Sequence, residues 1–216
     1  MARYTGPSCR QCRREQTKLF LKGAKCLTEK CPVERRPYAP GQHGQSAGGG
    51  PGRGGRKTSE YAKQLREKQK VKRMYGLTER QFRNTFESAS LEPGVKGTNL
   101  LVALETRLDN VVYRMGFASS RKAARQFIRH GHIEINGKRV DIPSYHVVKG
   151  QEVRVTPSSR ELVAVKMSQE LAGRGSPMSW LNVDNDKAAG RLVEVPTRDA
   201  IPVNAQEQLI VELYSK

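Results

Sequence analysis

Four cysteines near the start of the sequence have the spacing of metal ligands. Cys9 and Cys12 are separated by two residues, thirteen residues follow, and Cys26 and Cys31 are separated by four. Each close pair can supply two thiolates of a tetrahedron, as in a structural zinc site. No His, Asp or Glu stands at ligand spacing beside the pairs. We therefore expect one structural Zn2+ ion and no open catalytic position.

Other states of these cysteines stay open, namely an iron–sulfur cluster, disulfides or metal-free thiols. The four cysteines fall within 23 residues and the following 185 residues contain none, which argues against ordinary core use. Disulfides need an oxidising compartment, which nothing in the sequence indicates. Nearby cations are expected to lower the thiol pKa values and so to favour metal binding. These cations are Arg10, Arg13, Arg14, Lys18, Lys22, Lys25 and Lys30.

The charge of the chain predicts a polyanionic partner. Its 216 residues include 39 Lys and Arg against 21 Asp and Glu, a net charge of +18. Such an excess favours nucleic acid, because binding releases the counterions condensed on the phosphates. No apolar run approaches the ~20 residues that cross a bilayer, and no basic amphipathic helix carries an apolar membrane face. With no secretion signal at the start, we expect a cytoplasmic protein that binds no membrane.

The positive charge is concentrated in the first two thirds of the chain. Residues 1–75 carry 19 basic and 5 acidic residues, and residues 107–155 carry 10 and 4. Residues 156–216 are nearly neutral, with 7 basic and 8 acidic residues. We expect the polyanion along the first two thirds and a protein partner at the tail.

Residues 107–155 predict a compact module that binds phosphates. A short helix is expected between Ser120 and Gly131, because serine caps the start of a helix and glycine its end. Asn136-Gly137 then predicts a type I′ hairpin. At roughly 100° per residue, four cations share about one quadrant of this helix. They are Arg121, Lys122, Arg125 and Arg129, and the hairpin adds Lys138 and Arg139.

The rest of the chain predicts further helices and short strands. We expect a basic helix over residues 59–75 that contacts a nucleic-acid backbone and a second over 78–88. A longer helix is predicted from Thr98 to Met115, with Arg107 and Arg114 on its polar side. Strands are expected at 147–148, 153–155, 192–195 and 209–213. Trp180 is expected to pack in a core and not to stack on a base.

The glycine-rich stretch within residues 37–57 predicts a flexible basic loop. It lacks the Lys-Ser/Thr ending of a phosphate-binding P-loop, and no apolar strand precedes it. We expect no nucleotide or other small-molecule site there. Arg53, Arg56 and Lys57 are instead expected to lie along a nucleic-acid backbone.

Short motifs along the whole sequence occur in the order typical of one protein family. In the module they are Arg107-Leu108-Asp109-Asn110, Arg114-Met115-Gly116-Phe117-Ala118, Ser120-Arg121, Ala124-Arg125, His130-Gly131-His132, Asn136-Gly137 and Pro143-Ser144. Outside it they are Pro40-Gly41-Gln42-His43-Gly44, Tyr75-Gly76-Leu77-Thr78-Glu79-Arg80-Gln81-Phe82 and Leu209-Ile210-Val211-Glu212-Leu213-Tyr214. The first set resembles the αL RNA-binding motif, a helix-turn-helix followed by a hairpin. Both sets and the cysteines resemble the zinc-bearing branch of the bacterial small-subunit ribosomal protein four family.

The resemblance and the predicted elements together imply an α+β fold in which an αL module is inserted into a helical domain. The expected parts are a zinc knuckle (1–45), the basic loop (46–57), a helical domain (58–105), the αL module (106–170) and a C-terminal segment that packs back on the helical domain (171–216). The expected RNA contacts in the module are Arg107, Arg114, Ser120, Arg121, Lys122, Arg125, Arg129, His130, His132, Asn136, Lys138 and Arg139. Those before it are Arg13, Arg14, Lys18, Lys22, Arg53, Arg56, Lys57, Lys63, Arg66, Lys70 and Arg73.

The resemblance also implies a function and partners. Members of this family bind small-subunit rRNA at a multi-helix junction of the 5′ domain and help to nucleate assembly. They also lie at the mRNA entry channel beside small-subunit ribosomal proteins three and five (S3 and S5), where they influence mRNA unwinding and decoding accuracy. We expect this role for the chain.

An RNA-modifying enzyme of the pseudouridine synthase type is the alternative interpretation. Those enzymes carry an Arg-Leu-Asp tripeptide with a catalytic aspartate, and Arg107-Leu108-Asp109 offers the tripeptide. In the enzymes it lies in a separate catalytic domain, whereas Asp109 lies inside a predicted helix of the module. We expect Asp109 to cap a helix or to pair with a cation, and we expect no catalysis.

Overall fold

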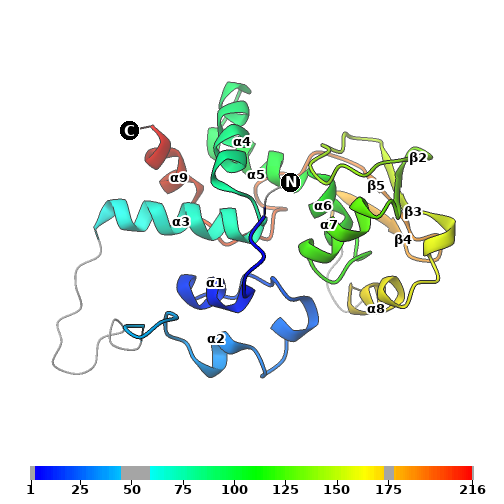
Figure 1. Cartoon of the computed structure of the whole chain (residues 1–216). Helices are drawn as coiled ribbons and strands as arrows, with labels where there is room; N and C mark the ends of the chain where they lie inside the picture. Colours follow the sequence, from blue (N-terminus) through cyan, green and yellow to red (C-terminus); the bar gives the residue numbers. More distant parts are fainter. Residues whose placement is uncertain (1–2, 45–58, 173–177, 216) are drawn as a thin grey trace. The chain divides into compact units, whose positions relative to one another are not determined.

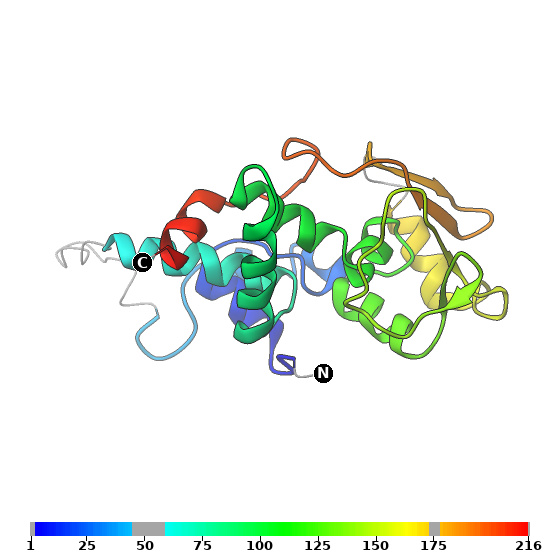
Figure 2. The same ribbon diagram turned by 90° about the horizontal axis from the view of Figure 1, so that it is seen from above.

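The computed structural model describes residues 3–44, 59–172 and 178–215, which fall in two compact units (Figures 1 and 2). The first unit comprises Met1–Arg83 and Asn204–Lys216, and the second unit comprises Asn84–Val203. The second unit is thus inserted in sequence between the two parts of the first. No described helix combines the length and the apolar character needed to span a membrane.

The first unit is helical in the parts that the structure describes. It contains α1 (Ser8–Glu15), a 3-10 turn η1 (Gly23–Cys26), α2 (Pro32–Arg35), α3 (Glu60–Met74), the start of α4 (Glu79–Leu91) and α9 (Glu207–Tyr214). Helix α3 begins where the sequence predicts, because the Ser59 hydroxyl accepts a hydrogen bond from the Ala62 amide at 3.3 Å. Cys12, Leu19 and Leu21 form a small buried cluster, against which Val33 and Met74 pack.

The predicted strand at 209–213 is wrong, because these residues lie within α9. The apolar run has high strand propensity, but packing against α3 decides its conformation. Ile210 is fully buried, and the Gln64 amide of α3 donates to the Glu212 carboxylate at 3.0 Å. The ring of Tyr214 also stacks on Phe82 of α4, with centroids 6.3 Å apart.

Glu79 connects three helices of the first unit. Its carboxylate accepts hydrogen bonds from Lys68 at 2.6 Å and Lys72 at 2.8 Å, both on α3. The Tyr214 hydroxyl of α9 donates to it at 3.2 Å. Partial burial would raise the pKa of Glu79, but the two lysine hydrogen bonds outweigh burial and lower it to about 2.

The second unit packs helices against a small antiparallel sheet. Its described elements after α4 are α5 (Lys96–Glu105), α6 (Leu108–Arg114), α7 (Arg121–Arg129), β1 (Ile133–Ile135), β2 (Lys138–Arg139), β3 (Glu152–Val155), the 3-10 turn η3 (Pro157–Ser159), α8 (Val163–Ala172), β4 (Leu181–Asp184) and β5 (Ala189–Leu192). Within the described residues the five strands have the order β2-β1-β3-β5-β4, and all neighbours are antiparallel. The core includes Phe117, Ile128 and Trp180, each fully buried, which confirms the packed position predicted for Trp180.

The helix and hairpin predicted in the middle of this unit are confirmed. The Ser120 hydroxyl accepts from the Ala123 amide at 3.3 Å and caps α7, and Gly131 follows the helix at φ +74°. Asn136 and Gly137 have φ values of 49° and 79° between β1 and β2. Two positive φ values in a row are the requirement of a type I′ turn.

The single helix predicted from Thr98 to Met115 is wrong. It is divided into α5 and α6 at Arg107, whose backbone is extended (φ −64°, ψ 139°). The break is stabilised by a distant segment, since the Val147 amide donates to the Thr106 carbonyl at 2.9 Å and the Leu108 amide to the Tyr145 carbonyl at 2.8 Å. Continuous apolar periodicity could not reveal partners about 40 residues away in the chain.

Other element boundaries also differ from the expectations. Residues 147–148 form no strand, and of the segment 192–195 only Leu192 lies in a strand. The sequence patterns did not predict α8 or β4. The two compact units meet between Arg83 and Asn84, while the boundary predicted between residues 105 and 106 coincides with the break between α5 and α6. Residues 171–216 are divided, since β4 and β5 extend the sheet of the second unit while α9 packs on α3.

Glu79→Gln should lower the melting temperature by a few degrees at pH 7, because the ionised carboxylate stabilises the fold through Lys68 and Lys72. The folded pKa of about 2 lies below the ordinary value of 4.5, so this stabilisation is present above pH 4.5 and is lost as the pH falls toward 2. The melting temperatures of the variant and the unchanged chain should therefore converge as the pH is lowered from 7 to 2. Glu170→Gln, at an exposed position on α8, serves as the control. A difference that stays constant over this range would contradict the assignment.

Candidate nucleic-acid interface

Asp109 is a buried carboxylate that holds two of the arginines expected to contact RNA. Arg107 donates to both carboxylate oxygens, from Nε at 3.1 Å and from Nη2 at 2.9 Å. Arg125 of α7 donates from Nη1 at 3.0 Å. All three residues are at most 6% exposed. The prediction that Asp109 pairs with a nearby cation is confirmed.

Glu105 organises a second group of buried polar side chains. Arg114 forms a two-pronged pair with it, from Nε at 2.9 Å and from Nη2 at 2.7 Å. The Asn110 amide also donates to Glu105, and its oxygen accepts from Arg121 Nε at 2.7 Å. The Arg121 guanidinium lies 4.7 Å from the centroid of the Tyr113 ring. Arg121 is therefore fixed by neutral and anionic groups of its own unit.

The cationic face predicted for α7 is thus divided by the tertiary structure. Arg121 and Arg125 point into the unit, with side chains 11% and 8% exposed, whereas Arg129 is exposed. Lys122 is half-buried. Helical periodicity placed these residues on one side correctly, but it could not show that buried carboxylates of α5 and α6 occupy part of that side.

An exposed basic cluster remains where α7 meets the hairpin. We define the hairpin cluster as Arg129, His130, His132, Lys138 and Arg139; all except the half-buried His132 are exposed. A Cβ at Gly131 would lie 3.0 Å from Cδ of Arg139, so glycine lets this side chain cross the end of α7. The rings of His130 and His132 are 6.0 Å apart. Burial, together with His130 and Arg139, lowers the pKa of His132. The cluster offers cations and hydrogen-bond donors to a phosphate backbone.

Two other predicted contacts have structural roles in the second unit. Ser120 is buried and caps α7. Asn136 occupies the hairpin turn, and its side-chain oxygen accepts from the Glu152 amide at 3.0 Å.

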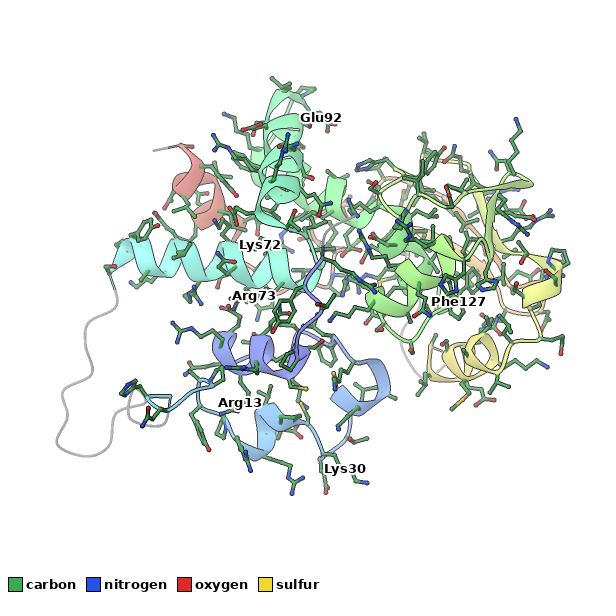
Figure 3. The ribbon with its side chains drawn as sticks, viewed as in Figure 1. Arg13, Lys30, Lys72, Arg73, Glu92 and Phe127 are labelled. Atoms are coloured by element: carbon green, nitrogen blue, oxygen red, sulfur yellow. The ribbon has the colours of Figure 1, made fainter. Side chains whose placement is uncertain are left out.

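Many cations predicted for RNA contact in the first unit are paired with acids. Lys63 pairs with Glu60 at 2.7 Å and Lys70 with Glu67 at 2.8 Å. Arg66 pairs at 3.4 Å with Glu15, whose side chain is 2% exposed. Arg73 extends from α3 toward α1 and also pairs with Glu15 (Figure 3). Burial raises the pKa of Glu15, and the arginines partly offset this rise.

Arginine and lysine side chains near α1 also join it to neighbouring segments of the first unit. Arg13 donates from Nε to the Tyr38 carbonyl at 3.0 Å, and its guanidinium lies 4.8 Å from the centroid of the Tyr38 ring. Lys18 pairs with Glu34. Lys22 and Arg14 are exposed. Arg53, Arg56 and Lys57 lie outside the described residues.

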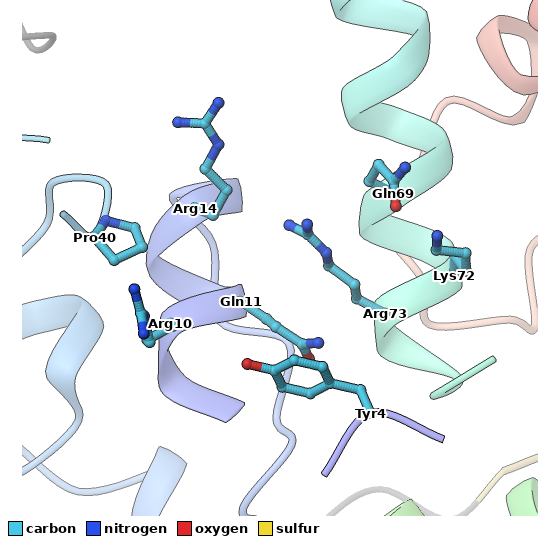
Figure 4. A pocket seen from close by; sticks show the side chains of 8 residues that line it. All are labelled: Tyr4, Arg10, Gln11, Arg14, Pro40, Gln69, Lys72 and Arg73. Atoms are coloured by element: carbon cyan, nitrogen blue, oxygen red, sulfur yellow. The ribbon is translucent and has the colours of Figure 1, made fainter. Parts of the chain in front are cut away.

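A cavity of about 350 Å³ between α1 and α3 is lined by cations and polar side chains (Figure 4). Of the lining residues, only Arg14 and Arg73 were predicted from the sequence to contact RNA. The sequence could have indicated this side of the cavity, because Arg10 and Arg14 are four residues apart and therefore lie one helical turn from each other on α1. The lining consists of Tyr4, Arg10, Gln11, Arg14, Pro40, Gln69, Lys72 and Arg73.

The four cysteines of the first unit are not joined by disulfides. Cys12, Cys26 and Cys31 are buried, Cys9 is half-buried, and the Lys22 amide donates to the Cys26 sulfur at 3.4 Å. Burial raises the pKa of the Cys12 and Cys26 thiols, which contradicts the predicted lowering by nearby cations. Those cations are mostly exposed, so water screens them, while the thiols are buried. Among the described residues, no three His, Cys, Asp or Glu side chains are grouped closely enough to hold a metal ion.

Comparisons with known proteins match the whole chain. Residues 3–105 match the family described as Ribosomal protein S4/S9 N-terminal domain, and residues 106–153 match the S4 domain. The chain is 55% identical over 217 residues to Small ribosomal subunit protein uS4 of Thermodesulfovibrio yellowstonii, with complete coverage of both chains. It is 54% identical to the protein of that name from Geotalea daltonii and 50% identical to that from Thermus thermophilus, each over 216 residues with complete coverage.

Arg125→Ala should lower the free energy of unfolding of the second unit by about 3 kcal/mol, because Asp109 would stay buried with one guanidinium fewer. Arg129→Ala, one turn further along α7, should change it by less than about 0.5 kcal/mol because the side chain is exposed. Urea denaturation followed by fluorescence is suitable, since the sole tryptophan, Trp180, is buried in this unit. Equal midpoints for the two variants would show that the buried pair does not stabilise the unit.

Proposed function

Because the chain belongs to the small ribosomal subunit protein uS4 family, we propose that it is a structural constituent of the small ribosomal subunit that acts by binding rRNA. The observation that carries this proposal is identity of 50–55% to proteins of that name over their whole length. The family is structural and not enzymatic. This function also places the chain in the cytoplasm, within the ribosome.

The exposed hairpin cluster supports recognition of RNA through its phosphates. Lys138 and Arg139 lie on β2, beside Arg129 and His130 at the end of α7. Basic side chains on a rigid hairpin and helix end can follow a folded RNA backbone, because folded RNA is recognised mainly by its shape. The arginines around Asp109 and Glu105 fix α7, and thereby the position from which the exposed cations act.

The environment of Asp109 does not favour the alternative, an RNA-modifying enzyme. A nucleophilic aspartate must reach the substrate with a carboxylate oxygen. Both oxygens of Asp109 accept hydrogen bonds from Arg107 or Arg125, and the residue is 4% exposed. Such a group stabilises the fold.

Within the subunit, we propose the finer role that the resemblance implies. The chain would bind a multi-helix junction of the rRNA 5′ domain early in assembly and would contribute to the mRNA entry channel and decoding accuracy beside S3 and S5. The nearly neutral charge of residues 156–216 supports a protein-facing tail. Exposed Val193 and Val195 lie in this segment.

We also propose that Cys9, Cys12, Cys26 and Cys31 hold one structural Zn2+ ion, with an iron–sulfur cluster as the alternative. The four free thiols lie close enough for each of the others to affect the pKa of Cys12. The amide of Lys22 already donates to a sulfur, as amides do to metal-bound thiolates. When bound, zinc would cross-link the two cysteine pairs and so stabilise a segment with a small apolar core.

Lys138→Ala combined with Arg139→Ala should weaken binding to a folded transcript of the small-subunit rRNA 5′ domain. The slope of log K against log salt concentration should become shallower by about one unit for each phosphate that the variant no longer neutralises. Lys166→Ala with Lys187→Ala removes two exposed cations of the same unit that pair with Glu161 and Asp184, and this control should keep the slope. An unchanged slope in the hairpin variant would exclude this surface.

The purified chain should release about one zinc per molecule as its cysteines are alkylated, detected with a colorimetric chelator. Removal of zinc should unfold the segment from α1 to α2, because the buried thiols would lose their cross-link. An iron–sulfur cluster would instead give visible absorption and acid-labile sulfide. A metal-free chain that folds normally would refute both metal assignments.

A further inference from the structure

The cavity between α1 and α3 combines an aromatic ring with an excess of positive charge. Tyr4 comes from the start of the chain, Arg10 and Arg14 from α1, and Lys72 and Arg73 from α3 (Figure 4). All belong to the first unit. None of the described residues that line the cavity is acidic. This composition favours an anionic ligand with a flat group.

The cations of the cavity differ in how far their charge is already balanced. Arg73 pairs with Glu15, and Lys72 pairs with Glu79 at 2.8 Å. Arg10 and Arg14 are exposed, and neither forms an ion pair with a described acidic residue. The α1 side therefore has two guanidinium groups whose charge a phosphate can balance, and guanidinium binds phosphate in a planar, two-pronged manner.

The backbone at Gly6 allows the ring of Tyr4 to lie close against it. A Cβ on Gly6 would stand 2.6 Å from the Tyr4 hydroxyl oxygen and 2.7 Å from Cζ, so any larger residue would displace the ring. The ring is nonetheless 46% exposed. A half-exposed aromatic ring that lines a basic cavity is suited to stacking on a base.

The size of the cavity limits the ligand. Its volume of about 350 Å³ lies near the lower end of the range of small-molecule pockets, roughly 300–1,000 Å³. A base-paired duplex cannot enter such a space, whereas a single nucleotide turned out of a strand can. The Gln11 and Gln69 amides line the same cavity and can donate to and accept from a base edge.

We propose that this cavity binds one unpaired nucleotide of the rRNA, with the base stacked on Tyr4 and the adjoining phosphate held by Arg10 and Arg14. The proposal rests on the rRNA-binding function proposed above and adds a contact with an unpaired residue to the backbone contacts of the hairpin cluster. An acidic peptide would use the cations but would gain little from the aromatic ring.

Binding of the full chain to the folded 5′-domain transcript tests the stacking contact. Tyr4→Ala should weaken binding on the order of ten-fold, because a stacked base is worth ~1–3 kcal/mol, and should leave the salt slope unchanged. Tyr4→Phe keeps the ring and should bind nearly as the unchanged chain does. Tyr61→Ala is the matched control, since Tyr61 is 57% exposed on α3 of the same unit and does not line the cavity.

The proposed contact of Arg10 and Arg14 with a phosphate can be tested separately through the salt dependence of binding. Arg10→Ala with Arg14→Ala should reduce the salt slope by about one to two units, in contrast to Tyr4→Ala. Crosslinking of the unchanged chain to a transcript that contains 4-thiouridine should join the peptide that includes Tyr4 to a nucleotide that is unpaired in the free RNA. This measurement does not depend on the folding of any variant.

The outcomes distinguish the cavity proposal from the proposed rRNA-binding function. Equal affinity of Tyr4→Ala and the unchanged chain, or a crosslink of the Tyr4 peptide to paired residues only, would overturn the cavity proposal and leave rRNA binding intact. Failure of the unchanged chain to bind the transcript would overturn both.

Discussion

Two buried carboxylates, Glu105 and Asp109, determine how the second unit is built. Asp109 holds Arg107 and Arg125, and Glu105 holds Arg114 with the support of Asn110 and Arg121. Burying these ions is costly, and only the two-pronged geometry and the additional hydrogen bonds offset the cost. The same contacts join the break between α5 and α6 to the first turns of α7. Since α7 leads directly into β1, they also fix the position of the exposed hairpin.

The basic character of the chain therefore has two physically different parts. Some cations are paired inside a unit and stabilise it, as Arg125 does with Asp109 and as Arg66 and Arg73 do with Glu15. Others are exposed on rigid elements, as in the hairpin cluster, and can neutralise phosphates at little conformational cost. A formal net charge of +18 predicts the class of partner, but it does not tell which cations meet that partner.

In the first unit, polar contacts join elements beside the buried cluster of Cys12, Leu19 and Leu21 and the buried side chains of Val71, Phe82 and Ile210. Glu79 joins α3, α4 and α9, Glu15 joins α1 to α3, and Arg13 fastens the segment around Tyr38 to α1. The metal ion proposed for the cysteines would add a cross-link beside the cluster that contains Cys12.

The sequence by itself determined the local features: the capped helix at Ser120, the Asn136-Gly137 turn, the capped start of α3, and the family through motifs in a fixed order. These depend on residues near one another in the chain, whose chemistry sets backbone conformation directly. Only the tertiary structure decided the break at Arg107, the helical state of 209–213, the inward turn of Arg121 and Arg125, and the cavity that Tyr4 lines with α1 and α3. Each of these depends on a partner distant in sequence, whose packing or charge outweighs the local preference.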